Sequence, residues 1–131
     1  MTDKIELTEN EVIVAKILFD FFMETKGESL ITYKWLSDKS KEKGLKYEPD
    51  ALCNVLDHIN KRCFQIQKDV PMISVIVINH KEGHPGLGFF MLRNNMHPER
   101  EDADVHKAFL DEWKRVREFK EWEKIFAELS K

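Results

Sequence analysis

The stretch that decides the fold is residues 71–90, PMISVIVINHKEGHPGLGFF, in which an apolar run leads through a loop of Gly, Pro and His to two phenylalanines. The run from Ile73 to Ile78 is β-branched except for one serine, a composition typical of a buried strand and too short for a buried helix. Turn-forming residues follow, and Phe89–Leu92 predicts a second strand. The stretch therefore predicts a β-hairpin whose loop spans residues 79–88.

The glycines of this loop raise the alternative of a phosphate-binding cradle. Such a cradle joins a strand to the N-terminus of a helix, because the helix amides and dipole attract the anion. In the predicted hairpin the loop joins strand to strand, so its glycines are assigned to turn positions that need positive φ. His80, Lys81 and His84 would lie at the tip of that loop.

Helical patterns precede the hairpin. Thr8 and Glu11 have the spacing of a capping box, which predicts a helix over residues 8–26. A short strand at 30–31 and a short polar helix at 32–44, capped at its first residue by a threonine, are expected next.

A third helix is predicted to begin near Pro49, and it has the clearest amphipathic pattern in the chain. Its apolar residues recur at intervals of three and four. These residues are Leu52, Val55, Leu56, Ile59 and Cys63. The opposite face is polar and includes Asn54, His58, Lys61 and Arg62.

The last helical region spans residues 103–129. Large apolar residues recur there at intervals of three and four, but Lys120 occupies a position where an unbroken repeat would have an apolar residue. The pattern predicts a bend near Arg117 or two short helices. The region also holds residue types that anchor protein interfaces, although aromatics in a terminal helix usually pack inward, here over the first helix. The candidate interface residues are Trp113, Arg117, Phe119 and Trp122.

The predicted order is helix, short strand, helix, helix, strand, loop, strand and C-terminal helix, which is the order of a winged-helix domain. We therefore predict a single α+β domain over residues 1–131. Its winged-helix-like core would span 8–92, with the hairpin loop as the wing, and an added helical extension would span 103–129.

Composition narrows the classes of function. The 21 basic and 24 acidic residues give a net charge of -3, so any surface for nucleic acid must be local. Neither a leader pattern nor an apolar run of the ~20 residues that span a membrane is present, so we expect a cytoplasmic chain without membrane contact. Cys53 and Cys63 are ten residues apart on one predicted helix, about 15 Å, which excludes a disulfide between them.

Patterns for catalysis or metal binding are weak. The histidines do not form the compact pairs of a zinc site, and Cys53, His58 and Cys63 point in three directions around a helix. Ser74 lies in an apolar strand without an activating base nearby in the sequence. We predict no metal, no cofactor and no catalytic residue. The sequence favours a non-catalytic protein, with a hydrolytic enzyme as the least favoured alternative.

The segment ITYKWL, followed by Pro71, an apolar strand and a glycine turn, resembles the DNA-binding core of the alkylguanine-DNA alkyltransferases and their alkyltransferase-like relatives. Thr32, Tyr33 and Leu36 match the T-Y-x-x-(I/L) segment of that family. The family's reactive Cys-His-Arg motif is replaced here by Met, Ile and Ser at residues 72–74. The resemblance therefore implies a winged-helix topology without alkyl transfer.

A second resemblance covers about residues 29–126. P71-M-I-S-V-I-V-I-N79 followed by G83-H-P-G-L-G-F-F90 is similar to the pattern Pro-x-(Leu/Ile)-Ser-x-x-Val-x-Asn-x-x-x-Gly-x-Pro-Gly-x-Gly-Phe-Phe. That pattern is found in small, largely uncharacterised bacterial and phage domains that often accompany restriction or other defence proteins. The resemblance implies a shared fold, and no functional residue is carried over from it.

The leading hypothesis is a non-catalytic module that binds or accompanies nucleic acid in bacterial or phage defence. DNA or RNA would meet the polar face of the third helix and the loop. Asp50 and Asp57 lie on that same face and would repel phosphate. The alternative is a protein-interaction module, such as an adaptor, an inhibitor or a homodimer, that uses the aromatic C-terminal helix. The predicted nucleic-acid contacts are Asn54, His58, Lys61, Arg62, His80, Lys81 and His84.

Overall fold

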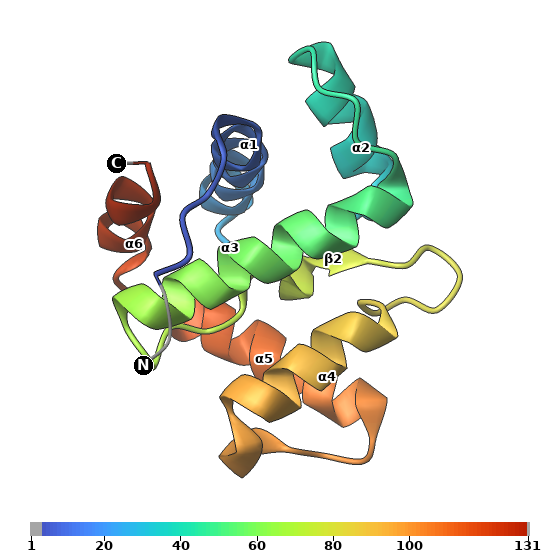
Figure 1. The fold of residues 1–131 in the computed structure, drawn as a ribbon. Helices are drawn as coiled ribbons and strands as arrows, with labels where there is room; N and C mark the ends of the chain where they lie inside the picture. Colours follow the sequence, from blue (N-terminus) through green and yellow to red (C-terminus); the bar gives the residue numbers. More distant parts are fainter. Residues whose placement is uncertain (1–3, 131) are drawn as a thin grey trace.

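The computed structural model describes residues 4–130, and its architecture is mainly helical (Figure 1). Three single turns of 3₁₀ helix, η1, η2 and η3, lie between the longer elements of this part of the chain. In chain order the elements are α1 (Glu9–Thr25), β1 (Ile31–Thr32), α2 (Tyr33–Glu42), η1 (Pro49–Ala51), α3 (Leu52–Ile66), η2 (Ile73–Ile76), β2 (Val77–Ile78), α4 (Leu87–Met96), η3 (Pro98–Arg100), α5 (Val105–Glu118) and α6 (Trp122–Leu129).

Helix α3 is the centre of the arrangement. Figure 1 shows α3 running across the middle of the molecule, with α1, α2 and α6 on one side and α4 and α5 on the other. Helix α1 packs against α2, α3 and α6, while α4 packs against α3, and α5 packs against η2. The N-terminal segment passes beside the C-terminal half of α3, where the Ile5 amide donates to Gln65 Oε1 at 2.7 Å.

The prediction of an α+β winged-helix domain is wrong. Strands β1 and β2 are only two residues long, and they pair in parallel with Ile31 opposite Val77. The described residues contain no β-hairpin, because the expected second strand, Phe89–Leu92, is part of helix α4. The loop after β2 therefore joins a strand to a helix and is not a wing.

The apolar run before this loop is buried as expected, but most of it is not a strand. Ile73–Ile76 forms the turn η2, and only Val77–Ile78 pairs with β1. Because β1 offers two residues as a partner, the remainder of the run satisfies its backbone locally. The Val75 amide donates to the Met72 carbonyl at 3.0 Å.

Helix α4 forms because its inward residues have helical spacing. Phe89, Phe90, Arg93 and His97 are all buried, at intervals of one, three and four along the chain. Arg93 occupies the middle of that stripe. Because it is charged, the hydrophobic pattern in the sequence stops after the phenylalanines and does not indicate a helix. Gly86 is the N-cap residue of α4, with extended backbone angles.

Several helix boundaries were predicted correctly. Thr8 and Glu11 form the capping box of α1, and the Thr32 hydroxyl accepts from the Trp35 amide at the start of α2. The C-terminal region consists of two helices, α5 and α6, which confirms one of the two predicted alternatives, two short helices in place of one bent helix. The apolar stripe of α3 is buried at every expected position, namely Leu52, Val55, Leu56, Ile59 and Cys63.

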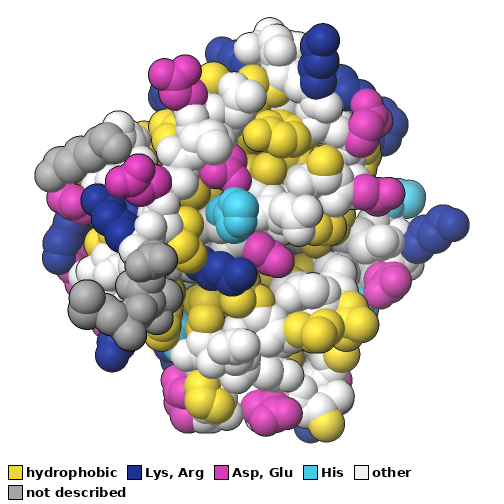
Figure 2. Space-filling view, viewed as in Figure 1, with side chains coloured by type: hydrophobic (Ala, Val, Ile, Leu, Met, Phe, Trp, Pro, Cys, Tyr) yellow, Lys and Arg dark blue, Asp and Glu magenta, His cyan; other side chains and the backbone are white. Residues whose placement is uncertain are grey.

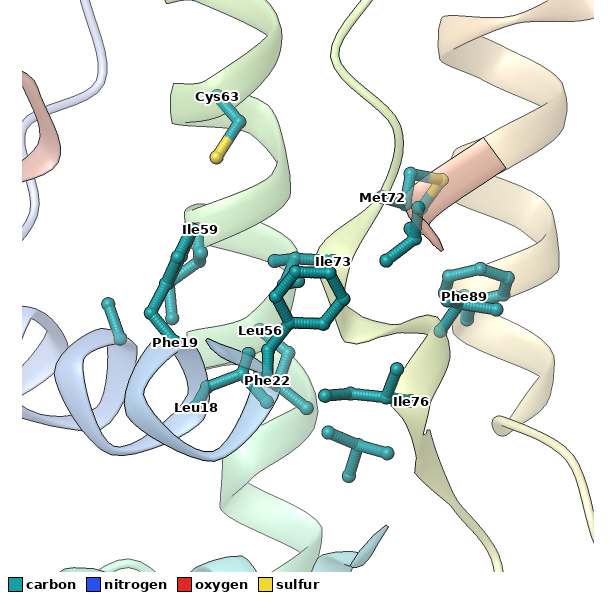
Figure 3. Packing of buried hydrophobic residues seen from close by; sticks show 14 of the residues in the cluster. Leu18, Phe19, Phe22, Leu56, Ile59, Cys63, Met72, Ile73, Ile76 and Phe89 are labelled. Carbon is teal, nitrogen blue, oxygen red and sulfur yellow. The ribbon is translucent and has the colours of Figure 1, made fainter. Parts of the chain in front are cut away.

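One hydrophobic core joins elements from both ends of the chain. Figure 3 shows side chains of α1, such as Phe19 and Phe22, meeting Leu56 and Ile59 of α3. The segment carrying Ile73 and Ile76 lies between these helices and Phe89 of α4 (Figure 3). Buried residues of α5 and α6 belong to the same cluster, so the C-terminal helices are integral to the core. These are Ala108, Phe109, Val116, Trp122, Ile125 and Leu129.

A buried ionic cluster fastens α5 to α4 and η2. The Glu112 side chain is fully buried, and its Oε1 accepts from Arg93 Nε at 2.8 Å while its Oε2 accepts from the Met72 amide at 2.9 Å. Arg93, with a side chain 1% exposed, also donates to Asp111 Oδ2 at 2.6 Å and to the Arg100 carbonyl at 2.8 Å. Both charges are thus compensated by several hydrogen bonds, as burial requires.

Replacing Glu112 by alanine is expected to lower the free energy of unfolding by about 3–5 kcal/mol, because Arg93 stays buried without its main partner. Urea unfolding followed by circular dichroism measures this loss. Glu118→Ala, at an exposed position of the same helix, should change the free energy by less than about 0.5 kcal/mol. A loss below about 1 kcal/mol for Glu112→Ala would contradict the assignment. Arg93→Met/Glu112→Leu should be less destabilised than Glu112→Ala, because neither charge is then stranded.

Gly27, just after the end of α1, forms a second contact that joins distant helices, α1 and α5. It has φ +74°, and its carbonyl accepts from Trp113 Nε1 of α5 at 2.7 Å. A Cβ at this position would lie 2.6 Å from the Phe22 ring and 3.0 Å from Arg117 Cγ. Close packing and positive φ therefore both favour glycine here.

Gly27→Ala should consequently destabilise the protein more than Gly44→Ala. Gly44 also has positive φ, +86°, but a Cβ there would meet nothing within 4 Å. The Gly44 variant isolates the backbone penalty of about 1–2 kcal/mol, and the excess in the Gly27 variant reports the clash with Phe22. Melting temperatures of the two variants provide the comparison. Equal losses would show that the Phe22 ring moves aside without cost.

Candidate functional site

A hollow of about 700 Å³ lies between the N-terminal segment, the C-terminal half of α3 and the C-terminal half of α4. We call it the basic groove. Lys4 and Ile5 form one wall, and Leu92, Asn95 and Met96 of α4 form the other. Residues of α3 and of the turn that follows it lie between the two walls, namely Lys61, Arg62, Phe64, Gln65 and Lys68.

The cations of the groove come from three separate segments of the chain. Lys61 and Arg62 are partly exposed on α3, Lys68 is exposed just beyond its end, and Lys4 approaches from the N-terminal segment. Among the described residues, no carboxylate lies within ion-pair distance of any of these four side chains. Three of them nevertheless lie near carboxylates: Lys61 interacts electrostatically with Asp57, and Lys4 and Arg62 share a neighbouring hollow of about 220 Å³ with Glu6 and Glu128. The four cations can therefore pair with an anion, in a field that these acidic residues weaken.

Apolar surface lies beside these charges. Phe64 and Leu92 are partly exposed in the groove, and the Phe64 ring packs edge-on against the buried His97 ring, with centroids 5.4 Å apart. This contact holds the Phe64 ring from one side. The groove thus combines cations that form no ion pair with any described residue and an aromatic ring held in place.

The absence of acidic residues distinguishes the basic groove from other hollows of the described surface. Four further hollows, of about 220–640 Å³, each include at least one Asp or Glu among their lining residues. The lining of the basic groove includes none. Figure 2 shows the face on which α3 and α4 lie, and elsewhere on this face acidic and basic side chains are interspersed.

Two of the predicted contacts on α3 lie outside this groove. Asn54 is exposed near the start of the helix, and His58 is exposed near its middle. His58 Nδ1 lies 2.6 Å from Oε2 of Glu11, a buried carboxylate whose other oxygen accepts from the Thr8 amide. His58 is therefore engaged with the capping box of α1.

The predicted loop contacts lie toward the other end of α3. His80 and Lys81 are exposed and border a second hollow of about 640 Å³, together with Asp50 and Cys53. Cys53 and Lys61 are eight residues apart on α3, which separates the two hollows by about 12 Å along the helix axis. The structure therefore does not bring these loop residues together with Lys61 and Arg62.

His84 is occupied inside the loop itself. Its Nδ1 lies 2.7 Å from the Pro85 carbonyl, its Nε2 lies 3.5 Å from Glu82, and its ring packs edge-on against Phe90.

The loop does join a strand to a helix, which is the topology of a phosphate cradle, but most of its amides are already used. Asn79 Oδ1 accepts from the amides of Lys81 and Glu82, and the Asn79 carbonyl accepts from the Gly83 amide. The Gly86 amide donates to the Tyr33 hydroxyl at 3.0 Å. These loop amides are therefore bonded within the protein and are not free to hold a phosphate. This bonding excludes a phosphate cradle, whereas the predicted hairpin, which was the earlier reason, is not present in the described residues.

The second hollow lacks an activated nucleophile. Cys53 is exposed, but partial desolvation of its thiol, reinforced by the Asp57 and Asp50 carboxylates, raises the pKa above its ordinary value. Burial likewise raises the pKa of the neighbouring Tyr33 hydroxyl. Both groups therefore stay protonated at neutral pH, which is the reverse of what nucleophilic catalysis needs.

The predicted interface residues of the C-terminal region contact the rest of the fold. Trp122 is buried and donates from Nε1 to the Val116 carbonyl at 2.9 Å, and Phe119 packs against it with centroids 4.8 Å apart. Trp113 is partly buried, and Arg117 lies over its ring at 4.8 Å from the centroid. These aromatic faces are largely occupied within the protein.

Residues 4–130 contain no group of three or more His, Cys, Asp or Glu side chains placed to hold a metal ion. In the same part of the chain, no helix has both the length and the apolar character needed to cross a membrane.

Comparison with known proteins gives no relatives: no family model matches the chain, and neither does any curated protein or solved structure. Function is therefore inferred from the geometry of the site.

Sequence reasoning found two of the groove's cations and missed the rest of it. Lys61 and Lys68 are seven residues apart, and this proximity in the sequence was available as a signal, although α3 ends at Ile66 and Lys68 lies in the turn beyond it. The contributions of Lys4 and Leu92 were not, because they depend on how the N-terminal segment and α4 pack on α3.

The two thiols are expected to differ sharply in reactivity. Both are free, as predicted, but Cys53 is exposed whereas Cys63 is buried with its pKa raised to about 12. In native buffer a thiol reagent should label one cysteine per chain, slowly at pH 7 and faster as rising pH forms the Cys53 thiolate. The second cysteine should react only after denaturation. Cys53→Ser should abolish native labelling, and two equally fast thiols would contradict the buried position of Cys63.

Proposed function

We propose that this protein binds nucleic acid through the basic groove. The observation that supports this proposal is the gathering of Lys4, Lys61, Arg62 and Lys68 around a hollow without a carboxylate, on a chain whose net charge is -3. In an otherwise acidic chain such a gathering is local and specific. Phosphate oxygens are the anions to which lysine and arginine bind most generally.

The strength of such an interaction comes from counterion release. Each phosphate neutralised by Lys or Arg releases condensed cations from the nucleic acid, so affinity falls steeply with salt. Cations already paired with protein carboxylates would contribute little, and those of the basic groove are not so paired within the described residues.

This proposal keeps Lys61 and Arg62 from the sequence prediction and replaces the surface around them. The loop residues His80 and Lys81 border another hollow and are not part of the proposed site. A role in bacterial or phage defence stays a prediction from the resemblance. The alternative of a protein interface on α5 and α6 receives less support, because Trp122 is buried there.

The test is binding of purified protein to labelled DNA and RNA across a salt series. Lys61→Gln/Arg62→Gln/Lys68→Gln should weaken binding at least tenfold. It should also reduce the slope of log affinity against log salt by about two, the value for three cations on a single strand.

Lys46→Gln/Lys107→Gln/Lys114→Gln is the matched control. It removes three charges from exposed lysines outside the groove and changes the net charge equally. This control should bind almost as the wild type does. Equal losses in the two triple variants would show nonspecific attraction, and no binding at low salt would remove the proposed function altogether.

A further inference from the structure

We infer that the basic groove accepts a single strand, with one base lying against the Phe64 ring, and not a duplex. This inference deepens the proposed function and rests on it. It follows from the shape of the surface, from its apolar floor and from the way in which Phe64 is held.

The shape of the surface argues against a duplex. A helix that reads duplex DNA must project far enough to enter the major groove, about 12 Å wide. Lys61 and Arg62 instead lie in a recess, because Ile5 and Lys4 flank α3 on one side and the end of α4 flanks it on the other. The flanking segment is fixed to α3 by the bond from the Ile5 amide to Gln65 Oε1. A flexible strand can enter such a recess, whereas the rigid phosphate ridges of a duplex meet only its rim.

The floor of the recess suits a nucleobase. Phe64, Leu92 and Met96 present partly exposed apolar surface between the cations. Phosphate alone gives these side chains nothing to contact, whereas a base has a flat face that stacks on an aromatic ring. One aromatic ring among four cations supplies both kinds of contact that single-strand binding combines, base stacking and phosphate pairing.

The Phe64 ring is already positioned for stacking. His97 is buried, and its ring supports Phe64 edge-on, with an angle of 86° between the ring planes. A ring held in place loses little conformational freedom when a base covers it. Asn95 is exposed on the opposing wall, where its amide can donate to or accept from a base edge.

Phe64→Leu tests the role of the ring, since leucine keeps an apolar side chain and removes the aromatic face. Affinity for a labelled oligothymidylate is expected to fall roughly 5- to 150-fold, the range for one lost stacking contact. Affinity for an abasic oligonucleotide of equal length should not change, because its phosphates still meet the same cations. The wild type should bind oligothymidylate at least tenfold more tightly than a duplex of equal charge.

Phe21→Leu is the matched control, because Phe21 is also partly buried and packs against one ring, that of Trp35, outside the groove. It should bind every probe as the wild type does. Urea midpoints of both variants verify that each is folded in the assay. All affinities are measured at one salt concentration, because affinity for nucleic acid itself changes with salt.

The outcomes separate the two proposals. If duplex and single strand bind equally, or if Phe64→Leu weakens abasic and normal strands alike, the single-strand inference is overturned while nucleic-acid binding stands. Inorganic polyphosphate binding as tightly as oligothymidylate would also overturn the role of the base. If no oligonucleotide binds even at low salt, the proposed function itself fails.

Discussion

The buried pair of Arg93 and Glu112 is the interaction on which the arrangement of the second half of the chain depends. Removing two charges from water costs several kcal/mol each, so the pair is stable only with every partner in place. Glu112 therefore receives Arg93 from α4 and the Met72 amide from the segment before η2. Because Asp111 binds the same guanidinium, α5 meets α4 through two successive carboxylates. A shift of any of these three elements would leave a buried polar group without its partner. The pair therefore restricts the relative positions of the three elements to a narrow range.

The basic groove inherits its shape from this constraint. Leu92 and Met96, which form its α4 wall, are the neighbours of Arg93 on the same helix, one residue before it and three after it. Anchoring Arg93 on α5 therefore determines which residues α4 presents toward α3. The opposite side of α3 is held differently, through Glu11 of the α1 capping box and its bond to His58. The central helix is thus fixed from both sides, and its polar residues are divided between structural bonds and the groove.

The extent to which the sequence predicted this structure follows from the range of the interactions involved. The capping box of α1 and the stripe of α3 depend on residues three or four apart, and both were predicted correctly. Helix α4 was missed because Arg93 occupies a core position and only its distant partner, Glu112, makes burial of a charge acceptable. The turn η2 was missed because its β-branched run needed a longer partner strand than the two residues of β1. Of the site, Lys61 and Arg62 could be read from one helix, whereas Lys4 and Leu92 could not, since tertiary packing brings them there.

The acidic residues of α3 bear directly on binding of phosphate, and none of them lines the groove, although Asp57 lies close to it. Asp57 precedes Lys61 by one helical turn, and burial raises the pKa of its carboxyl, while Lys61 and His58 act in the opposite direction. Asp50 borders the second hollow at the far end of the helix. At physiological salt, fields from exposed charges fade within about 8 Å, so the potential at the groove is set by the residues that line it and by neighbouring carboxylates such as Asp57, Glu6 and Glu128. A chain with net negative charge can therefore present a positive surface, provided that most of its carboxylates lie farther from that surface than this, or are bonded within the fold. Glu11 and Glu112 meet the second condition, since each carboxylate accepts at least two hydrogen bonds or ion-pair contacts inside the protein.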